Sequence, residues 1–109
     1  MPYNIYVEFI EATLFTKYVY EYLTEEEYTG LQVFLANHPE MGALVPGSGG
    51  VRKIRWSIKG KGKRGGVRVI YYFKKSEKEI WLLTIYQKNE IESIPAYVLR
   101  LIAREIEND

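Results

Sequence analysis

The sequence predicts an α+β fold in which a strand and two helices precede a three-stranded antiparallel meander and a final helix. Two segments in the first half and one at the end space their apolar residues as a helix does, whereas three runs between them resemble strands. With 109 residues, of which 47% are hydrophobic and 27% charged, the chain has the size and composition of one globular domain. We therefore expect residues 1–109 to form a single domain.

The N-terminal part is expected to form a strand followed by a helix. Tyr3–Phe9 is rich in Tyr, Ile, Val and Phe, the residue types that favour strands. From Thr13, whose hydroxyl suits an N-cap, apolar residues recur at the spacing of one helical face. That predicted face consists of Leu14, Phe15, Tyr18, Val19 and Tyr22. The pattern is typical of a helix that builds a core and indicates no chemistry.

A second helix is predicted to follow directly. Thr24 and Glu27 have the spacing of a capping box, in which each side chain binds the backbone N–H of the other residue. The helix should end at Asn37, because a residue before proline disfavours helical backbone angles and Pro39 follows His38. Its inward side chains are expected to be Tyr28, Leu31, Val33, Phe34 and Leu35. We interpret His38 as structural or exposed.

Three strand-like runs are predicted after a glycine-rich loop at residues 42–50. The runs are Val51–Lys59, Val67–Lys74 and Glu79–Gln87, and the polar turn Lys75–Lys78 joins the last two. In the first run, alternation places Lys53 and Arg55 on a polar face and Trp56 on the opposite, core-facing one. Trp81–Tyr86 is almost continuously apolar, which favours a central strand buried on both faces.

The last predicted element is a helix over Ile94–Ile106. Pro95 suits its first turn, because proline has no N–H and its fixed φ angle matches the helix. The apolar residues expected on its inward face are Ile94, Val98, Leu101, Ile102 and Ile106. This helix completes the predicted order.

The formal net charge of +1 conceals a strongly basic segment. Residues 51–75 contain ten basic residues and no acidic one, whereas residues 1–50 have a net charge of −6 and residues 76–109 one of −3. Charge concentrated in this way indicates a nucleic-acid or phosphate partner. A solvated lysine-rich hairpin is the alternative interpretation.

Cysteine is absent from the chain and His38 is the single histidine. This composition excludes a disulfide scaffold, a cysteine nucleophile, a cysteine-containing zinc site and a two-histidine acid–base pair. Chemistry on phosphate would therefore use Arg and Lys to stabilise charge and manage protons. No apolar run approaches about 18 residues and no N-terminal signal is present, so we expect a cytoplasmic protein with no membrane contact.

A glycine-lysine loop at Gly60–Val67 matches the pattern G-x-G-x-x-G. A dinucleotide site needs a helix after this loop, and here a strand is predicted. A kinase needs two aspartates in its site, and the single aspartate is Asp109. We interpret the loop as a hairpin tip that contacts a phosphate backbone through Lys59, Lys61, Lys63 and Arg64. One or two of Tyr71, Tyr72 and Tyr86 are expected to stack on unpaired bases.

Three motifs in a fixed order resemble a known family. They are Gly49–Arg55, Lys59–Tyr72 and Leu82–Glu90, which read GGVRKIR, KGKGKRGGVRVIYY and LLTIYQKNE. In this order and spacing the chain resembles the RelE/HigB family of type II toxins, and most closely its HigB-like branch with a glycine-lysine insertion. The resemblance covers nearly the whole chain, so a RelE-like fold is expected.

The resemblance implies an endoribonuclease that cuts messenger RNA in the ribosomal A site and so inhibits translation. The 2′-hydroxyl of the substrate would attack the adjacent phosphate, which leaves a 2′,3′-cyclic phosphate and releases a 5′-hydroxyl fragment. Neither a metal nor another cofactor is implied. The implied partners are the ribosome, messenger RNA and a HigA-like helix-turn-helix antitoxin, and operator DNA would be bound only by the toxin–antitoxin complex.

The resemblance also implies roles for individual residues. Lys53 and Arg55 match the paired basic residues of a strand and would bind phosphate, and one of them would help to deprotonate or stabilise the 2′-hydroxyl. Arg68 would stabilise charge on the pentacoordinate phosphate. Lys88 would assist the leaving 5′-oxygen, and Tyr86 would stack or hydrogen-bond at the site.

The remaining cations and one tyrosine have less defined roles in the resemblance. Lys63 and Arg64 would grip messenger or ribosomal RNA. Tyr97 is the other candidate for the C-terminal tyrosine of some relatives, but the predicted helix contains it. Arg55 and Lys88 have an alternative role as surface ion-pair partners, for example of Glu90.

Two other functions remain open from the sequence. A ParE-like toxin that poisons DNA gyrase would share the fold, but such relatives typically lack the dense basic face that Lys53, Arg55 and Arg68 form. A non-catalytic basic RNA-binding module would share the charge pattern without the chemistry. The basic residues favour the ribonuclease over both.

Overall fold

The order of strands and helices in the computed structural model confirms the predicted α+β fold. The structure describes residues 6–57, 66–87 and 94–108. Its elements are β1 (Glu8–Glu11), α1 (Thr13–Tyr22), α2 (Glu25–Asn37), β2 (Ala43–Leu44), β3 (Arg52–Trp56), β4 (Val67–Lys74), β5 (Glu79–Gln87) and α3 (Ala96–Glu107). The short strand β2 is an addition to the predicted order, because it lies in the segment expected to be a loop.

The strands form one mixed sheet in the order β1-β5-β4-β3-β2. β1 runs parallel to β5, and all other neighbours pair antiparallel. Because α1 and α2 carry the chain from β1 to the opposite edge, β2 starts there and the meander returns toward β1. β5 thus has a neighbour on each side, and its residues Leu82–Ile85 are buried, which confirms the predicted central strand.

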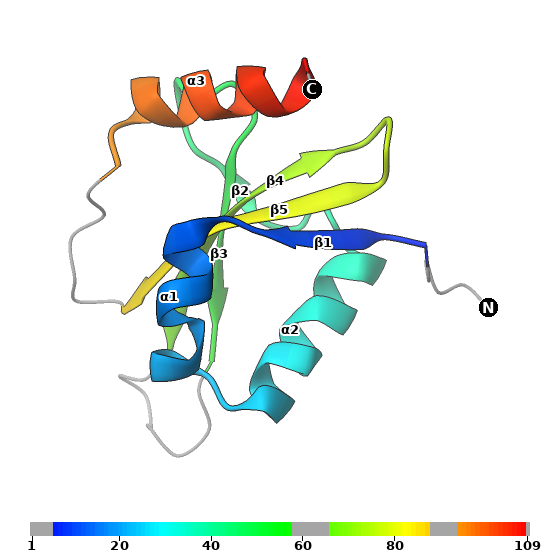
Figure 1. The fold of residues 1–109 in the computed structure, drawn as a ribbon, viewed down its shortest axis with the longest axis vertical. Helices are drawn as coiled ribbons and strands as arrows, with labels where there is room; N and C mark the ends of the chain where they lie inside the picture. Colours follow the sequence, from blue (N-terminus) through cyan, green and yellow to red (C-terminus); the bar gives the residue numbers. More distant parts are fainter. Residues whose placement is uncertain (1–5, 58–65, 88–93, 109) are drawn as a thin grey trace.

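The helices cover the two faces of the sheet unequally. In Figure 1, α3 lies above the sheet and α1 and α2 lie below it. Alternate residues of β4 reach the two layers: Val67, Val69 and Tyr71 pack toward α1 and α2, whereas Ile70 and Tyr72 pack toward α3. We call these the α1–α2 face and the α3 face. The molecule therefore has one apolar core on each face of the sheet.

The predicted boundaries need corrections at the first strand and at the final helix. β1 covers Glu8–Glu11, so Tyr6 and Val7 of the predicted strand precede it, and residues 3–5 of that prediction lie outside the described part of the chain. The helix α3 begins at Ala96, so Pro95 is its N-cap and not part of its first turn. The strand β3 covers Arg52–Trp56 of the predicted Val51–Lys59, and residues 58 and 59 lie outside the described part of the chain.

The capping box of α2 is confirmed. The backbone N–H of Glu27 donates to Thr24 Oγ1 at 3.0 Å, and that of Thr24 donates to Glu27 Oε1 at 2.8 Å. The predicted N-cap of α1 is wrong, because Ala12 is the N-cap and Thr13 is the first helical residue. The backbone N–H of Ala12 still donates to Leu82 O at 2.9 Å, so this single residue, bonded to the sheet, separates β1 from α1.

Two side chains predicted to face the core of the helical pair are exposed. Leu14 of α1 is 42% exposed and Val33 of α2 is 52% exposed. The buried stripe of α2 contains Leu31 and Leu35, and Val33, two residues from each, projects from the opposite side of the helix.

The inward face of α3 also differs from the prediction. The helix packs on the sheet through Leu99, Ala103 and Ile106, whereas Leu101 is 52% exposed. Apolar residues occupy more than half of the circumference of α3, so spacing alone does not identify the arc that meets the sheet. This leaves an apolar face of α3 that the described residues do not pack against.

Four hydrogen bonds fix the segment that leads into β2. The Tyr71 hydroxyl donates to Pro39 O at 2.8 Å and accepts from the N–H of Gly42 at 2.9 Å. Arg52 Nη1 donates to the carbonyl oxygens of Glu40 and Gly42 at 2.9 and 2.8 Å. A Cβ on Gly42 would lie 2.8 Å from the Tyr71 hydroxyl, so only glycine fits there.

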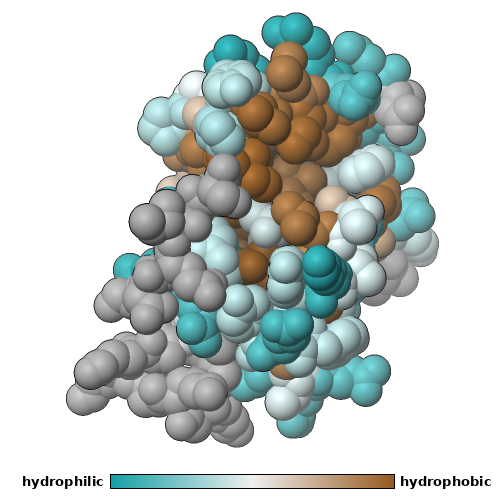
Figure 2. Space-filling view, turned by 60° about the vertical axis from the view of Figure 1, so that its left-hand side comes forward, coloured by the Kyte–Doolittle hydropathy of each residue, from teal (hydrophilic) through white to brown (hydrophobic). Residues whose placement is uncertain are grey.

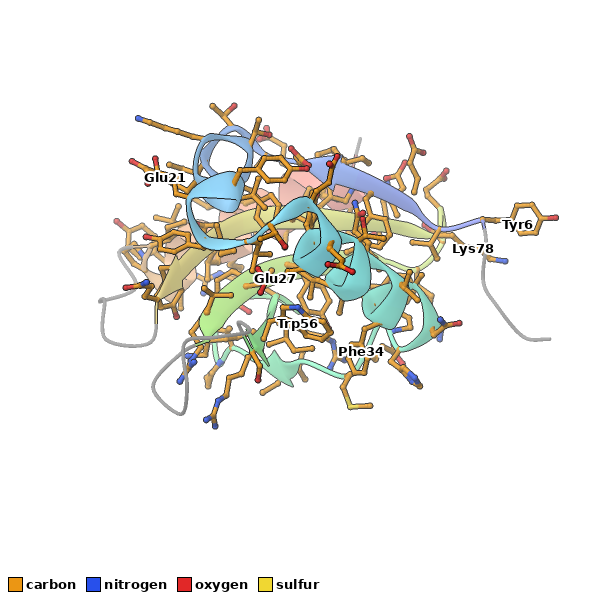
Figure 3. All side chains as sticks on the ribbon, turned by 90° about the horizontal axis from the view of Figure 1, so that it is seen from below. Tyr6, Glu21, Glu27, Phe34, Trp56 and Lys78 are labelled. Atoms are coloured by element: carbon orange, nitrogen blue, oxygen red, sulfur yellow. The ribbon has the colours of Figure 1, made fainter. Side chains whose placement is uncertain are left out.

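An aromatic pair connects α2 to β3 on the α1–α2 face. The rings of Phe34 and Trp56 lie 5.5 Å apart, and Figure 3 shows them side by side beneath α2. His38, the exposed C-cap of α2, packs its ring 5.0 Å from that of Phe34. These contacts hold β3 in place and turn the alternate residues of the strand toward the α3 face.

We expect the substitution Tyr71→Phe to destabilise the protein by about 1 to 3 kcal/mol, because it leaves a buried N–H without an acceptor. The measurement is urea-induced unfolding at neutral pH. Tyr20→Phe is the matched control, since Tyr20 is 59% exposed. Equal midpoints for the two variants would contradict the role of Tyr71.

Alkaline pH is also expected to weaken the fold. The Tyr72 hydroxyl donates to Glu107 Oε2 at 2.6 Å, and burial together with this carboxylate raises the pKa of Tyr72 to about 12. Burial likewise raises the pKa of Tyr28 and of Tyr71. A raised pKa means that the stability is complete below the unfolded value near 10 and is lost as pH rises toward the folded value.

Urea unfolding of the wild type at about pH 8, 10 and 11 checks this expectation. The unfolding free energy should fall above about pH 10, and Tyr72→Phe should reduce the slope because one titrating group is removed. An unchanged slope in that variant would show that Tyr72 does not contribute.

Candidate functional site

The sheet register brings three of the predicted site residues into one row. Arg55 of β3 pairs with Arg68 of β4, and Arg68 pairs with Tyr86 of β5. Directly paired residues project from the same face of a sheet, with Cα atoms about 5 Å apart. Their neighbours Ile54, Val67 and Ile85 belong to the core under α1 and α2. The Arg55–Arg68–Tyr86 row therefore lies on the α3 face.

Lys53 extends this row into a patch. It lies two residues before Arg55 on β3 and is exposed, so both cations project from the α3 face. Its direct partners are Ala43 of β2 and Ile70 of β4. Because those partners are small or apolar, the amine has no polar neighbour in direct register and extends the positive surface along β3.

The two arginines repel one another in the folded protein. Like charges directly opposite on neighbouring strands destabilise a sheet, by amounts on the order of 0.2 to 1 kcal/mol per pair. Within the described ranges, no hydrogen bond or ion pair engages the side chain of Lys53, Arg55 or Arg68. The positive charge of the patch is thus not neutralised from within this part of the chain, and an anion bound there would relieve the repulsion.

Tyr86, the third member of the row, is half-buried and packs against the core cluster under α3. Arg68 beside it is also half-buried, whereas Arg55 is exposed. The ring and the guanidinium are therefore held by the sheet with restricted freedom, which suits the positioning of a ligand. The arrangement presents one aromatic surface next to two cations.

Burial removes two of the three tyrosines considered for base stacking. Tyr71 is fully buried on the α1–α2 face, and its hydroxyl is used by Pro39 and Gly42. Tyr72 is 8% exposed and its hydroxyl binds Glu107. Their sequence positions near the cations did not distinguish these core residues from Tyr86, the tyrosine that remains beside the patch.

Several predicted site residues lie outside the described part of the chain. They are Lys59, Lys61, Lys63 and Arg64 of the glycine-lysine loop, together with Lys88 and its alternative ion-pair partner Glu90. The loop follows β3 and precedes β4, and Lys88 follows Gln87 at the end of β5.

Sequence reasoning missed the structural role of Arg52. Although it belongs to the same basic segment, its guanidinium is half-buried against the carbonyl oxygens of Glu40 and Gly42. The alternation of β3 was the available signal, because it separates Arg52 from Lys53 and Arg55. Tyr97, the second tyrosine considered for the site, is 59% exposed on the first turn of α3.

Across 6–57, 66–87 and 94–108, no group of three or more His, Cys, Asp or Glu side chains is arranged to hold a metal ion. Over the same ranges, no helix is long and apolar enough to cross a membrane.

Comparison with known proteins supports the fold. No family model matches the chain. Its structure is similar to that of the E. coli toxin RelE, solved in the free state as a mutant with two arginine-to-alanine substitutions, with a TM-score of 0.54 and 15% identity. The match covers 82% of this chain and 86% of that chain. The chain thus has a RelE-like fold, as expected.

We expect Arg68→Ala to weaken the binding of a fluorescent oligouridylate and to change its salt dependence. Each lost phosphate contact should reduce the slope of log K against log salt by about 0.7 for a single strand, measured between about 50 and 200 mM salt. Arg55→Ala should have the same effect. Lys75→Ala is the control, because Lys75 lies in the turn at the opposite end of β4. A slope unchanged in the arginine variants would contradict the site.

Proposed function

We propose that this protein is the toxin of a type II toxin–antitoxin system and that it cleaves messenger RNA in the ribosomal A site. The observation that carries the proposal is the Arg55–Arg68–Tyr86 row, in which two opposed guanidiniums without a carboxylate partner in the described ranges adjoin a half-buried aromatic ring. The RelE-like fold supports the toxin class. The sequence motifs support the HigB-like branch.

In this proposal the patch binds one phosphodiester of the RNA. The guanidiniums of Arg55 and Arg68 and the amine of Lys53 surround the non-bridging oxygens, and Tyr86 stacks on or hydrogen-bonds to an adjacent nucleotide. Arginine suits this task because its planar fork binds phosphate oxygens in pairs and keeps its charge. Binding energy here holds the phosphate still while the neighbouring ribose reacts.

The reaction uses the nucleophile of the RNA itself. The 2′-oxygen forms a bond to phosphorus while the bond from phosphorus to the 5′-oxygen breaks, which gives a 2′,3′-cyclic phosphate and a 5′-hydroxyl. Lys53 or Arg55 helps the 2′-hydroxyl to lose its proton, and Lys88 supplies a proton to the leaving oxygen. Arg68 stabilises the additional negative charge of the pentacoordinate phosphate, which is the largest electrostatic requirement of the step.

The loop cations and the protein partners complete the proposal. Lys59, Lys61, Lys63 and Arg64 would contact the backbone of messenger or ribosomal RNA without reading its sequence. A HigA-like helix-turn-helix antitoxin would bind the toxin and, as a complex with it, operator DNA. Activity on translating ribosomes requires a cytoplasmic location.

Induction of the wild-type chain in a bacterial host should stop growth and fragment transcripts. We expect Arg68→Ala to lower the cleavage rate at least about 100-fold, as the loss of one transition-state donor does elsewhere. The measurement follows growth, protein synthesis and the 5′ ends of a reporter transcript. Lys75→Ala, which changes a lysine far from the patch, should remain as toxic as the wild type.

The same experiment distinguishes the alternatives. Growth arrest with intact transcripts and damaged DNA would favour a ParE-like gyrase poison. RNA binding with neither cleavage nor arrest would favour a non-catalytic module. Equal toxicity of Arg68→Ala and the wild type would remove Arg68 from the site.

A further inference from the structure

The outward face of α3 carries exposed apolar side chains that no element of the described residues packs against. Leu101 is 52% exposed and Tyr97 59% exposed, while Val98 and Ile102 beside them are half-buried. Figure 2 shows hydrophobic surface over the upper part of this side of the molecule, at the level of α3, with hydrophilic residues around it. A monomer gains nothing from this exposure, so the face is a candidate interface.

The residues of this face have the spacing of a helix contact. Val98, Leu101, Ile102 and Glu105 follow one another at i, i+3, i+4 and i+7, which places them in one stripe. The described lining of a shallow open hollow along the stripe consists of Val98, Leu101, Ile102, Arg104, Glu105 and Asn108. A side chain of about leucine size from a facing helix fits such a hollow by ridges-into-grooves packing.

The charged residues of the stripe indicate which kind of partner helix can pack against it. Its N-terminal half is uncharged and carries the exposed ring of Tyr97, whereas its C-terminal half carries one cation and one anion, Arg104 and Glu105. A partner helix whose charges are all of one sign could therefore pair with only one of these two residues. A neutral partner with the same order of residues in the opposite direction would satisfy both groups.

That partner is a second copy of α3. In an antiparallel pair with a two-fold axis at Leu101, facing residue numbers sum to twice 101, so Glu105 of one copy lies opposite Tyr97 of the other, and the long side chain of the adjacent Arg104, opposite Val98, reaches the same ring. The Arg104 guanidinium meets the ring face, and the Tyr97 hydroxyl donates to the Glu105 carboxylate. The antiparallel helix dipoles also attract. We propose that two copies of this protein associate through α3 in this way.

Leu101→Cys tests the two-fold axis directly. The natural chain contains no cysteine, so any disulfide in this variant joins two copies. A residue on the axis of an antiparallel pair faces its own copy at a distance that a disulfide spans. Val33→Cys is the control, because Val33 has the same 52% exposure on α2. Under mild oxidation we expect Leu101→Cys to form at least about tenfold more cross-linked dimer, as equal exposure gives no other reason for a difference.

Sedimentation equilibrium of the unmodified chain provides a second measurement. One helix face is small beside the roughly 800 Å² per partner of a standard interface, so the dimer should form between about 10 and 500 µM. Leu101→Glu should weaken it at least about tenfold, because a buried charge replaces an apolar contact. Val33→Glu should leave it unchanged, and circular dichroism checks that both variants are folded.

Three outcomes would overturn the proposal. They are equal cross-linking of the two cysteine variants, a wild-type chain that stays monomeric at the highest concentration, and a dimer weakened equally by Val33→Glu. A monomeric chain would leave the α3 face to a different protein. The dimer does not depend on the proposed ribonuclease activity, since its test uses neither RNA nor the basic patch.

Discussion

The antiparallel pairing of β4 with β3 and β5 is the constraint on which the other features depend. Val67, Val69 and Tyr71 of β4 are fully buried, and a slip of one residue would move all three to the opposite face. Their burial therefore fixes this register, although the register places Arg55 opposite Arg68 and the two cations repel one another. Burying one aliphatic side chain is worth about 1.5 to 3 kcal/mol, more than the opposed charges cost.

A local irregularity in this pairing assigns consecutive residues of β5 to the two cores. The register shifts between Ile70 and Tyr71, so that Thr84 pairs with Ile70 but Leu82 pairs with Tyr71, and Leu83 is the extra residue. Leu83 joins the core under α3, whereas Leu82 stays in the core under α1 and α2. The bulge thus gives β5 consecutive buried residues on both faces of the sheet.

Much of the fold was predictable because it follows from local chemistry. The capping box at Thr24 and Glu27 and the limits of β4 and β5 depend on neighbouring residues, and they appear as expected. The placement of Lys53 and Arg55 on one face follows from alternation. The pairing of Arg55 with Arg68 does not, because register is set by the core. The short strand β2 was missed because distant residues, Arg52 and Tyr71, hold its backbone.

The contrast between Arg52 and Arg55 shows how the sheet divides one basic segment into two roles. Arg52 projects to the α1–α2 face, where two carbonyl oxygens satisfy its guanidinium and fix β2 beside β3. Arg55 projects to the α3 face, at the end that α3 leaves bare, and has no partner among the described residues. A single strand therefore supplies both a structural cation and a binding cation. Because Arg52 fixes the edge of the sheet, the backbone of β3 that carries Arg55 is rigid, and a rigid backbone favours the binding of a phosphate in one position.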